Sequence, residues 1–518
     1  MGGRPILAAR TARHQSIGRT HRQRRAQAHL QQTSAQHTPL LQHLPYLDDL
    51  QASWLLLLHA ASTRSNYLLR MLPPHLTTQF AQQDDASITA CLAQLLETTN
   101  FPAAAIARAH LPLTAGGLGL PSAMLHATPA YWASWADALA VLHKQDPTVT
   151  DTLLHHLANP SEASSHIAAA SQARTDLQDQ GWDPPSWDEL AAGQAPPHGH
   201  EEVGNGPVQP GWQRQAATPY HTAARAELYH TLDPPAQAML DSQSGPFSGR
   251  AFTSIPYTPD ATYPGPLFRL LLLRRLRLPL PLSDRICRCR RTVDPLGDHR
   301  SACPRTGVLR SRGGPLEIAA ARVCREAGAR VTMHTRITDL NIPAPCRLDE
   351  RRIEVIANGL PLWNGAQLAV DTTLVAPLTS TGQPRRRGGR YAGAALHEAR
   401  QAKERVYPEL QGMGRCRLVV FGIEVGGRWS TEAAQFLRSL AHTKARTVPA
   451  QLRHATVTAL IARWSASLTH AAMHAYAVSL LSMPPSSAIT GEEGLPPLGQ
   501  IVAQHPEAST TPSRLPGP

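Results

Sequence analysis

The hydrophobic residues follow a helical spacing over much of the N-terminal part of the chain. Between Leu40 and about Lys144 they recur roughly every three to four positions, in runs that begin at Asp48, Ser87 and Tyr131. Such a spacing gathers the apolar side chains on one side of a helix. We therefore expect a helical region over residues 39–150.

The periodicity is lost between residues 151 and 250. Residues 181–211 are rich in Pro, Gly, Trp, Glu and Gln, a composition typical of connecting segments. Short helical patterns cover Thr222–Thr231 and Pro235–Gln243. The pattern over residues 151–250 therefore predicts a linker that contains short helices.

The C-terminal part combines helix and strand patterns. Arg352–Ala357 alternates β-branched and charged residues as a half-buried strand does, and Gln367–Val375 has the apolar composition of a more buried strand. Asn358-Gly359 between them suits the positive φ angles of a tight hairpin turn. The order α-β-β-β-α-β predicts an α/β domain over residues 310–482, built from Pro315–Gly328, Arg330–His334, this hairpin, Ala394–Tyr407 and Arg417–Val425, with closing helices Thr431–Arg446 and Ala450–Leu481.

Two carboxylates interrupt the hairpin. Glu354 lies on its first strand, and Asp371 lies inside the apolar run of its second strand. Burying an uncompensated carboxylate is costly, and a metal ion is one compensation. Two carboxylates that face one cleft from neighbouring strands would make a Mg²⁺ site. The alternative is that both acids form ion pairs with Arg351, Arg352 or other arginines.

The charge balance favours an acidic partner. The formal net charge is +12, and the sequence pI is about 9.8. Nucleic acid is the simplest partner for such a chain. The alternative is a coding bias toward arginine, because Lys144, Lys403 and Lys444 are the only lysines. No stretch is long and apolar enough to predict a membrane span.

The cysteines point to a metal rather than to disulfides. Seven cysteines form an odd set, no secretory signal is expected, and three of the seven crowd into residues 287–303. Cys287, Cys289, His299 and Cys303 supply the three thiolates and one imidazole of a closed tetrahedral zinc site. Asp298 is expected to orient the histidine. The alternative is three buried free cysteines beside a surface histidine.

Arginines gather on both sides of this cluster. Phe268–Leu282 reads as a leucine- and arginine-rich helix closed by Pro279 and Pro281, and with the cysteine cluster it forms a zinc module over residues 251–309. An arginine-glycine loop follows the hairpin. We expect phosphate contacts from the arginines of these segments, namely Arg274, Arg275, Arg277, Arg288, Arg290, Arg291, Arg385, Arg386 and Arg387.

The two ends of the chain look unlike folded domains. Residues 1–38 contain seven arginines and no acid, which predicts a basic disordered arm. Arg19–Arg25 resembles a nuclear-localisation patch, and a mitochondrial transit peptide is the alternative for this acid-free start. Residues 483–518 are rich in Pro and Ser and predict a disordered tail.

Together, residues 287–303, 351–371 and 403–407 resemble the C-terminal half of non-LTR retrotransposon proteins that carry a restriction-like endonuclease. In that family a Cys-Cys-His-Cys zinc motif follows the reverse transcriptase and precedes a nuclease of the PD-(D/E)xK type. The similarity spans roughly residues 40–480 and is strongest over Ser283–Arg428. It implies a multidomain protein with a thumb- or connector-like helical region, a small zinc module and an α/β restriction-endonuclease-like domain with a mixed sheet.

The resemblance also implies roles for individual residues. Glu354 would be the first metal-binding acid and Asp371 the second. Lys403 would be the catalytic lysine displaced onto the following helix, with Tyr407 beside it and Glu317 as an extra acid of the cleft. The chain departs from the family pattern in lacking the Pro-Asp pair and in placing Asp349 where it competes with Glu354. A polymerase palm is also missing, so reverse transcription by this chain alone is not expected.

These implications lead to an expected function. The chain would be a Mg²⁺-dependent DNA endonuclease module that binds DNA, and possibly the RNA of its element, and holds a structural Zn²⁺. One alternative is a catalytically inactive nucleic-acid-binding remnant. Another is a scaffold protein whose acids form salt bridges.

Overall fold

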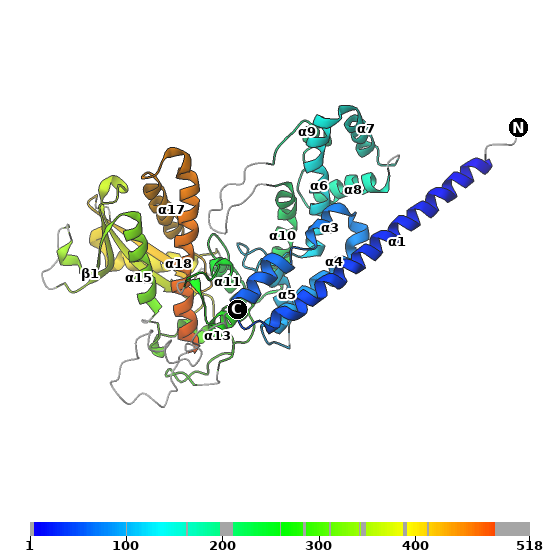
Figure 1. Ribbon diagram of the computed structural model, residues 1–518. Helices are drawn as coiled ribbons and strands as arrows, with labels where there is room; N and C mark the ends of the chain where they lie inside the picture. The colour runs from blue at the N-terminus through cyan, green and yellow to red at the C-terminus, as the bar shows by residue number, and fades with distance from the viewer. Residues whose placement is uncertain are drawn as a thin grey trace, which may run out of the picture.

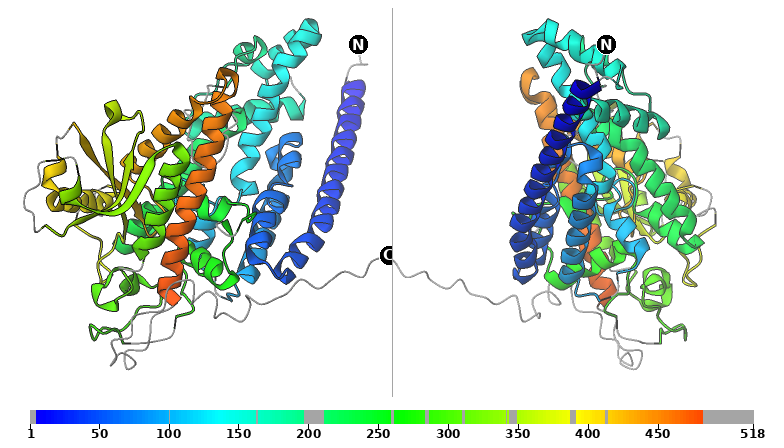
Figure 2. Two further views of the ribbon diagram at one scale, coloured as in Figure 1. Left: turned by 60° about the vertical axis from the view of Figure 1, so that its left-hand side comes forward. Right: turned by 90° about the vertical axis from the view of Figure 1, so that its right-hand side faces the viewer.

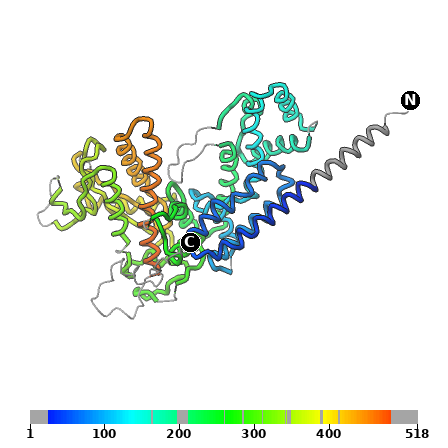
Figure 3. Tube along the Cα trace, in the orientation of Figure 1, coloured from blue at the N-terminus to red at the C-terminus, as the bar shows by residue number. Residues whose placement is uncertain are grey.

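The computed structural model describes residues 5–99, 101–161, 164–196, 211–258, 261–282, 286–309, 312–340, 342, 349–386, 391–411 and 414–481. This part of the chain is mainly helical, with one four-stranded mixed sheet near its C-terminal end. Figures 1 and 3 follow the chain from the N-terminal helices to the sheet on the opposite side of the molecule. The predicted tail at 483–518 lies outside the described residues.

The N-terminal region begins with a long helix rather than a disordered arm. Helix α1 spans Pro5–His43 and runs along α4, Pro74–Leu95 (Figure 1). Leu30 of α1 is buried against Leu68 and Phe80. The prediction of disorder over 1–38 is therefore wrong for the backbone of residues 5–38, which is helical, and the C-terminal half of this helix is anchored by the buried side chains of Leu30 and Leu41.

The predicted helical region 39–150 is helical. After α1 it contains α2 (Leu50–Leu56), a π-turn at Leu57–Ala61, α3 (Asn66–Met71), α4, α5 (Ala103–His110) and α6 (Ala123–Gln145). Asp49 caps α2, since its side chain accepts hydrogen bonds from the backbone N–H groups of Gln51 and Ala52.

The described residues between 147 and 242 form further helices, and α7 to α10 share a core with α6. These helices are α7 (Pro147–Ala158), α8 (Ser165–Asp179), α9 (Trp187–Ala191), α10 (Trp212–Thr231) and α11 (Pro234–Ser242). Trp132 of α6 lies at the centre, with ring centroids 6.2 Å from Trp187 and 5.8 Å from Trp212. The interpretation of this stretch as a linker is wrong for the described helices, although the two predicted short helices, Thr222–Thr231 and Pro235–Gln243, coincide with the second half of α10 and with α11.

A central segment joins the helices to the sheet. It includes α12 (Arg250–Thr253), α13 (Gly265–Leu276) and α14 (Asp298–Ala302). Helix α13 is buried along almost its whole length. It ends before the predicted prolines, because Arg277 adopts a left-handed conformation with φ 62°.

The C-terminal part has the predicted order of elements. Helix α15 (Gly313–Ala327) precedes β1 (Arg330–Arg336), β2 (Arg352–Asn358) and β3 (Gln367–Val375). Helix α16 (Ala394–Val406) then leads to β4 (Cys416–Glu424), α17 (Thr431–Ala445) and α18 (Arg453–Leu481). The sheet order is β1-β2-β3-β4, with the first three strands antiparallel and β4 parallel to β3.

Helices cover both faces of this sheet. On one face, Val355, Val370 and Phe421 belong to the main core with residues of α15, α17 and α18, and Figure 2 shows α15 and α18 side by side next to the strands. On the other face, Ile356 and Val420 pack in a second core with Tyr407 and Leu410 near the end of α16. The predicted tight turn between β2 and β3 is wrong, because residues 359–366 connect the two strands. Gly359 nevertheless has the expected positive φ, at 85°.

Candidate functional site

The hairpin carboxylates lie on neighbouring strands and the same face of the sheet. Val355 pairs with Val370 and Ile356 with Ala369. One step further along this antiparallel register places Glu354 opposite Asp371. Directly opposed residues project to the same side of a sheet. Here that side is the one covered by α16.

The side chain of Glu354 bonds to β3 next to the last backbone pair between β2 and β3. Its Oε2 accepts hydrogen bonds from the backbone N–H of Thr372, at 2.6 Å, and from the Thr372 hydroxyl, at 2.7 Å. Two bonds to one carboxylate oxygen fix the direction of the other oxygen. Thr372 is not among the predicted site residues, although a hydroxyl group directly after Asp371 in an apolar strand is a signal that the sequence contains.

Lys403 joins the two acids from α16. Its Nζ forms an ion pair with Oδ1 of Asp371 and lies 3.8 Å from Oε1 of Glu354. The structure thus brings together three of the five residues to which the resemblance assigns roles, Glu354, Asp371 and Lys403. The described ion pairs of both acids are with this lysine, and not with the arginines considered as the alternative.

Burial changes the protonation of this cluster. The side chain of Asp371 is 0% exposed, and its Oδ2 has no hydrogen-bond partner among the described residues. Burial, together with the negative charge of Asp371, raises the pKa of Glu354 to about 7, against the opposing effects of Lys403 and Thr372. Glu354 therefore exchanges its proton near neutral pH.

Tyr407 and Glu317 flank the cluster. The hydroxyl of Tyr407 donates a hydrogen bond to the carbonyl oxygen of Arg352 at 2.9 Å, and burial and the charge of Asp371 raise its pKa. Glu317 reaches from α15 to within 3.9 Å of Nε2 of His334. Burial raises the pKa of Glu317, and the charge of Asp371 adds to that effect. Neither residue has a described ion pair with Lys403.

Asp349 does not compete for the same position. Its carboxylate accepts hydrogen bonds from the guanidinium of Arg351, with distances of 2.9 and 3.0 Å from Nε. Arg351 also pairs with Glu409, at 2.6 Å. The geometry therefore favours Glu354 over Asp349 as the partner of Asp371.

The four cysteine and histidine residues predicted as zinc ligands lie together in the structure. The Sγ atoms of Cys287 and Cys303 are 3.9 Å apart, and Sγ of Cys289 lies 3.3 Å from Nε2 of His299. The four ligand atoms all lie within 4.8 Å of one another. A tetrahedral zinc site with bonds of ~2.0–2.3 Å separates its ligand atoms by roughly 3.3–3.8 Å. The predicted ligand set is therefore compatible with structural zinc.

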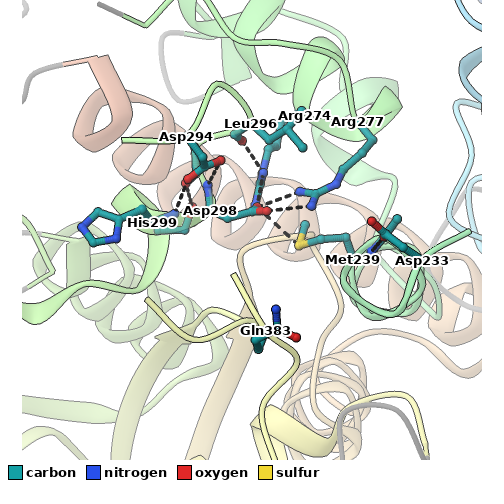
Figure 4. Close-up of polar contacts among 12 residues, drawn as sticks. Asp233, Met239, Arg274, Arg277, Asp294, Leu296, Asp298, His299 and Gln383 are labelled. Carbon is teal, nitrogen blue, oxygen red and sulfur yellow. Dashed lines mark hydrogen bonds and ion pairs between the residues drawn. The ribbon is translucent and has the colours of Figure 1, made fainter. Parts of the chain in front are cut away.

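The orientation of the histidine differs from the prediction. Nδ1 of His299 lies 2.7 Å from the carbonyl oxygen of Ser380, in the loop after β3. Asp298 instead pairs with Arg274 at 2.6 Å and with Arg277 at 2.6 Å (Figure 4). In the same view the imidazole of His299 points away from Asp298. The expected role of Asp298 as the partner of the histidine ring is wrong.

Part of the predicted phosphate-binding surface is buried. Arg274 is 3% exposed and Arg275 is 2% exposed. Arg275 donates hydrogen bonds to the carbonyl oxygens of Leu113, Gly117, Ser248 and Gly426 at 2.7–3.2 Å. The prediction of surface contacts is wrong for both residues, because α13 is buried in the main core, where Arg274 pairs with Asp298 and Arg275 with backbone carbonyls. Arg277, paired with Asp298, is also largely covered.

The remaining predicted arginines are more accessible. Arg288, Arg290 and Arg291 are exposed beside the cysteine cluster. Arg386 is exposed, and half-buried Arg385 donates a hydrogen bond from Nε to the carbonyl oxygen of Ala376 at 2.8 Å. Arg387 lies outside the described residues.

No protein-family model matches the chain, and no curated protein matches it. In the part of the chain that the structure describes, no helix is long and apolar enough to cross a membrane.

Proposed function

We propose that this chain is the DNA-binding, metal-dependent endonuclease module of a retrotransposon-derived protein. The observation that carries the proposal is the convergence of Glu354, Asp371 and Lys403 on one face of a mixed sheet. A helix, three antiparallel strands, a second helix and a parallel fourth strand support a restriction-endonuclease-like domain. The helical region and the zinc cluster precede this domain as in the family that the sequence resembles.

The acids of this site fit Mg²⁺. Asp371 has a buried oxygen without a hydrogen-bond partner, and Glu354 faces the same side of the sheet. Carboxylate oxygens are the ligands that Mg²⁺ prefers, so these two side chains would hold the ion. When bound, it would stabilise negative charge on the phosphate and lower the pKa of a bound water.

The chain's own residues supply the rest of the chemistry. Thr372 holds one oxygen of Glu354, so that the other faces Lys403. The ammonium of Lys403 orients the attacking water or stabilises the charge that develops on the scissile phosphodiester. Tyr407 and Glu317 border the site as flanking groups.

DNA binding would rest on phosphate contacts. Arg288, Arg290 and Arg291 project from the segment held by the cysteine cluster, and Arg386 lies on the loop after β3. These guanidinium groups would bind the backbone of DNA, or of the element's RNA, with strongly salt-dependent affinity. A DNA target places the site of action in the nucleus, or in the mitochondrion if the basic N-terminus acts as a transit signal.

The test uses the purified full chain and a supercoiled plasmid with Mg²⁺. We expect nicking by the wild-type chain and a loss of at least about 100-fold in Asp371→Asn, because an essential charge is removed without a change in shape. DNA binding in a gel-shift assay should persist. Asp339→Asn is the control, since Asp339 is an exposed acid of the same domain.

Two outcomes would contradict the endonuclease proposal. Equal nicking by Asp371→Asn and the wild-type chain would show that cleavage does not depend on this site. DNA binding without cleavage in Mg²⁺ or Mn²⁺ would identify the chain as the inactive nucleic-acid-binding remnant.

A further inference from the structure

The loop after β3 folds back on itself beside the cysteine cluster. We call residues 376–386 the β3–α16 loop. The backbone N–H of Thr379 donates to the carbonyl oxygen of Gln383 at 2.8 Å, and the N–H of Arg385 donates to that of Pro377 at 2.9 Å. Leu378 pairs with Pro384 in an isolated bridge. The loop is therefore a small hairpin with Ser380 near its tip.

The base and the tip of this loop have different surroundings. Leu378 at the base is buried with Ala238 and Met239 of α11. The tip is partly or fully exposed, and the contact described from Ser380 to the cysteine cluster is made by the ring of His299. The two segments are 81 residues apart in the sequence. This contact is thus a direct link between the predicted zinc centre and the domain that carries Glu354 and Asp371.

The segment that carries His299 is held firmly from its other side. Asp298 is paired with Arg274 and Arg277. The hydroxyl of Ser301 lies 2.7 Å from that of Tyr476 on α18. The backbone N–H of His299 donates to Asp294 at 2.7 Å. Because the main chain at His299 is fixed, the imidazole can act as an anchor for the loop.

Metal binding would determine what the imidazole offers to the loop. A neutral imidazole carries its proton on either ring nitrogen, and only the form with the proton on Nδ1 can donate to a carbonyl oxygen. A metal on Nε2 leaves Nδ1 as the protonated nitrogen. Nε2 is the atom that faces Cys289, and Nδ1 is the atom that faces Ser380.

We propose that zinc binding fastens the β3–α16 loop to the cysteine cluster through the Nδ1–H group of His299. The loop carries Arg385 and Arg386, and NH1 of Arg385 lies 3.8 Å from Glu398 on α16, the helix that also carries Lys403. Zinc occupancy therefore sets the position of these two arginines. The binding of an anionic partner by Arg385 and Arg386 rests on the proposed function. The attachment of the loop to the cysteine cluster does not, because it needs no DNA.

The first experiment is amide hydrogen exchange on the full chain with one equivalent of Zn²⁺. The variant His299→Cys offers four thiolates, which still bind zinc tetrahedrally, but it has no Nδ1–H. Its metal site is checked by the absorption bands of the Co²⁺-substituted protein. We expect amides of residues 379–386 to exchange about tenfold or more faster than in the wild type, as for the loss of one hydrogen bond from a metal-bound imidazole. Residues 286–303 should keep their protection.

The second experiment leaves every metal ligand in place. Residues 379–383 are replaced by Asn-Gly, a two-residue turn that closes the loop without its tip. Because coupling is reciprocal, loss of the carbonyl partner should weaken Zn²⁺ binding about 10- to 100-fold in a chelator competition. Wild-type exchange in the loop of zinc-bound His299→Cys, or unchanged zinc affinity in the shortened-loop variant, would overturn the fastening. Neither readout depends on endonuclease activity.

Discussion

Glu354 accepts two hydrogen bonds from Thr372, the residue that follows its cross-strand neighbour Asp371. The backbone N–H and the hydroxyl reach the same oxygen, at 2.6 and 2.7 Å. The other oxygen lies 3.8 Å from Nζ of Lys403. Thr372 therefore determines the direction in which the acid faces the proposed reaction.

The first prediction concerns the hydroxyl of Thr372. Thr372→Val keeps the β-branched shape but removes one hydrogen bond to Glu354, whereas Thr372→Ser retains the hydroxyl. We expect the Mg²⁺ concentration for half-maximal nicking to rise about tenfold in the valine variant only, as for the loss of a bond to a charged group. Titration of nicking against Mg²⁺ measures the shift.

The pH profile of nicking by these variants shows whether Thr372→Val acts on Glu354 or impairs the fold in general. The hydrogen bonds from Thr372 lower the pKa of Glu354, which burial raises to about 7. Removing the hydroxyl bond should raise that pKa further, so the acidic limb of the nicking profile should move to higher pH in Thr372→Val. An unshifted limb, or equal Mg²⁺ titrations for the valine and serine variants, would show that the hydroxyl does not position the acid.

A second buried acid gives a pH-dependent stability. Glu424 is 1% exposed at the end of β4, and its Oε2 has no hydrogen-bond partner among the described residues. Burial raises its pKa from the usual 4.5 to about 7; Ser242, Arg428 and Arg385 oppose the shift, and Asp241 adds to it. Between these two pKa values the folded chain binds more protons than the unfolded chain, so the free energy of unfolding falls as pH rises through this range.

The second prediction follows from this sign. Glu424→Gln cannot ionise, so relative to the wild type it should gain up to about 3 kcal/mol in the free energy of unfolding between pH 4.5 and pH 8. Urea denaturation of both proteins at several pH values measures the difference. Glu398→Gln is a control, since Glu398 is partly exposed at the surface of α16. Parallel pH curves for Glu424→Gln and the wild type would contradict the prediction.

The third prediction concerns the exposed arginines beside the cysteine cluster. Changing Arg288, Arg290 and Arg291 together to Gln should weaken DNA binding and reduce the slope of log affinity against log salt by up to about 2.7, since each phosphate contact contributes about 0.9. Affinity measured at several salt concentrations tests both effects. A charge-matched control changes three exposed arginines of another surface to Gln, Arg325, Arg330 and Arg336. If the two triple variants had equal slopes of log affinity against log salt, the segment that carries Arg288, Arg290 and Arg291 would not contact DNA.

The sequence was informative where structure is decided locally. The strands that carry Glu354 and Asp371 were located within a few residues, because alternation of apolar positions is a property of each strand by itself. The convergence of these acids with Lys403 is implied by the family resemblance, and the clustering of Cys287, Cys289, His299 and Cys303 is predicted by their types and spacing.

Features that depend on distant partners were missed. Trp132, Trp187 and Trp212 lie in three separate helices, and no local pattern indicates that their rings meet. Similarly, the residues next to Arg275 in the sequence do not indicate whether its guanidinium group binds phosphate or backbone carbonyls. Its partners at Leu113 and Gly426 lie 162 and 151 residues away. Only the folded chain distinguishes a buried structural cation from a nucleic-acid contact.

The last prediction tests the structural role of Arg275. Its guanidinium bonds to carbonyl oxygens from the N-terminal helical region, from the loop before α12 and from the turn after β4. Arg275→Met has similar length but leaves these carbonyls unpaired in a buried site. Since each unpaired buried group costs about 1–3 kcal/mol, we expect a loss of about 3–5 kcal/mol in the free energy of unfolding.

Two comparisons in urea denaturation make this test specific to the carbonyl contacts. Arg288→Met removes an exposed arginine and should change stability by less than about 0.5 kcal/mol. Arg275→Lys keeps the charge but not the planar set of donors, so its loss should lie between those of the two methionine variants. If Arg275→Met were as stable as Arg288→Met, the carbonyl contacts would not hold the helical region to the sheet domain. A lysine variant as stable as the wild type would instead show that the charge suffices without the geometry of the guanidinium.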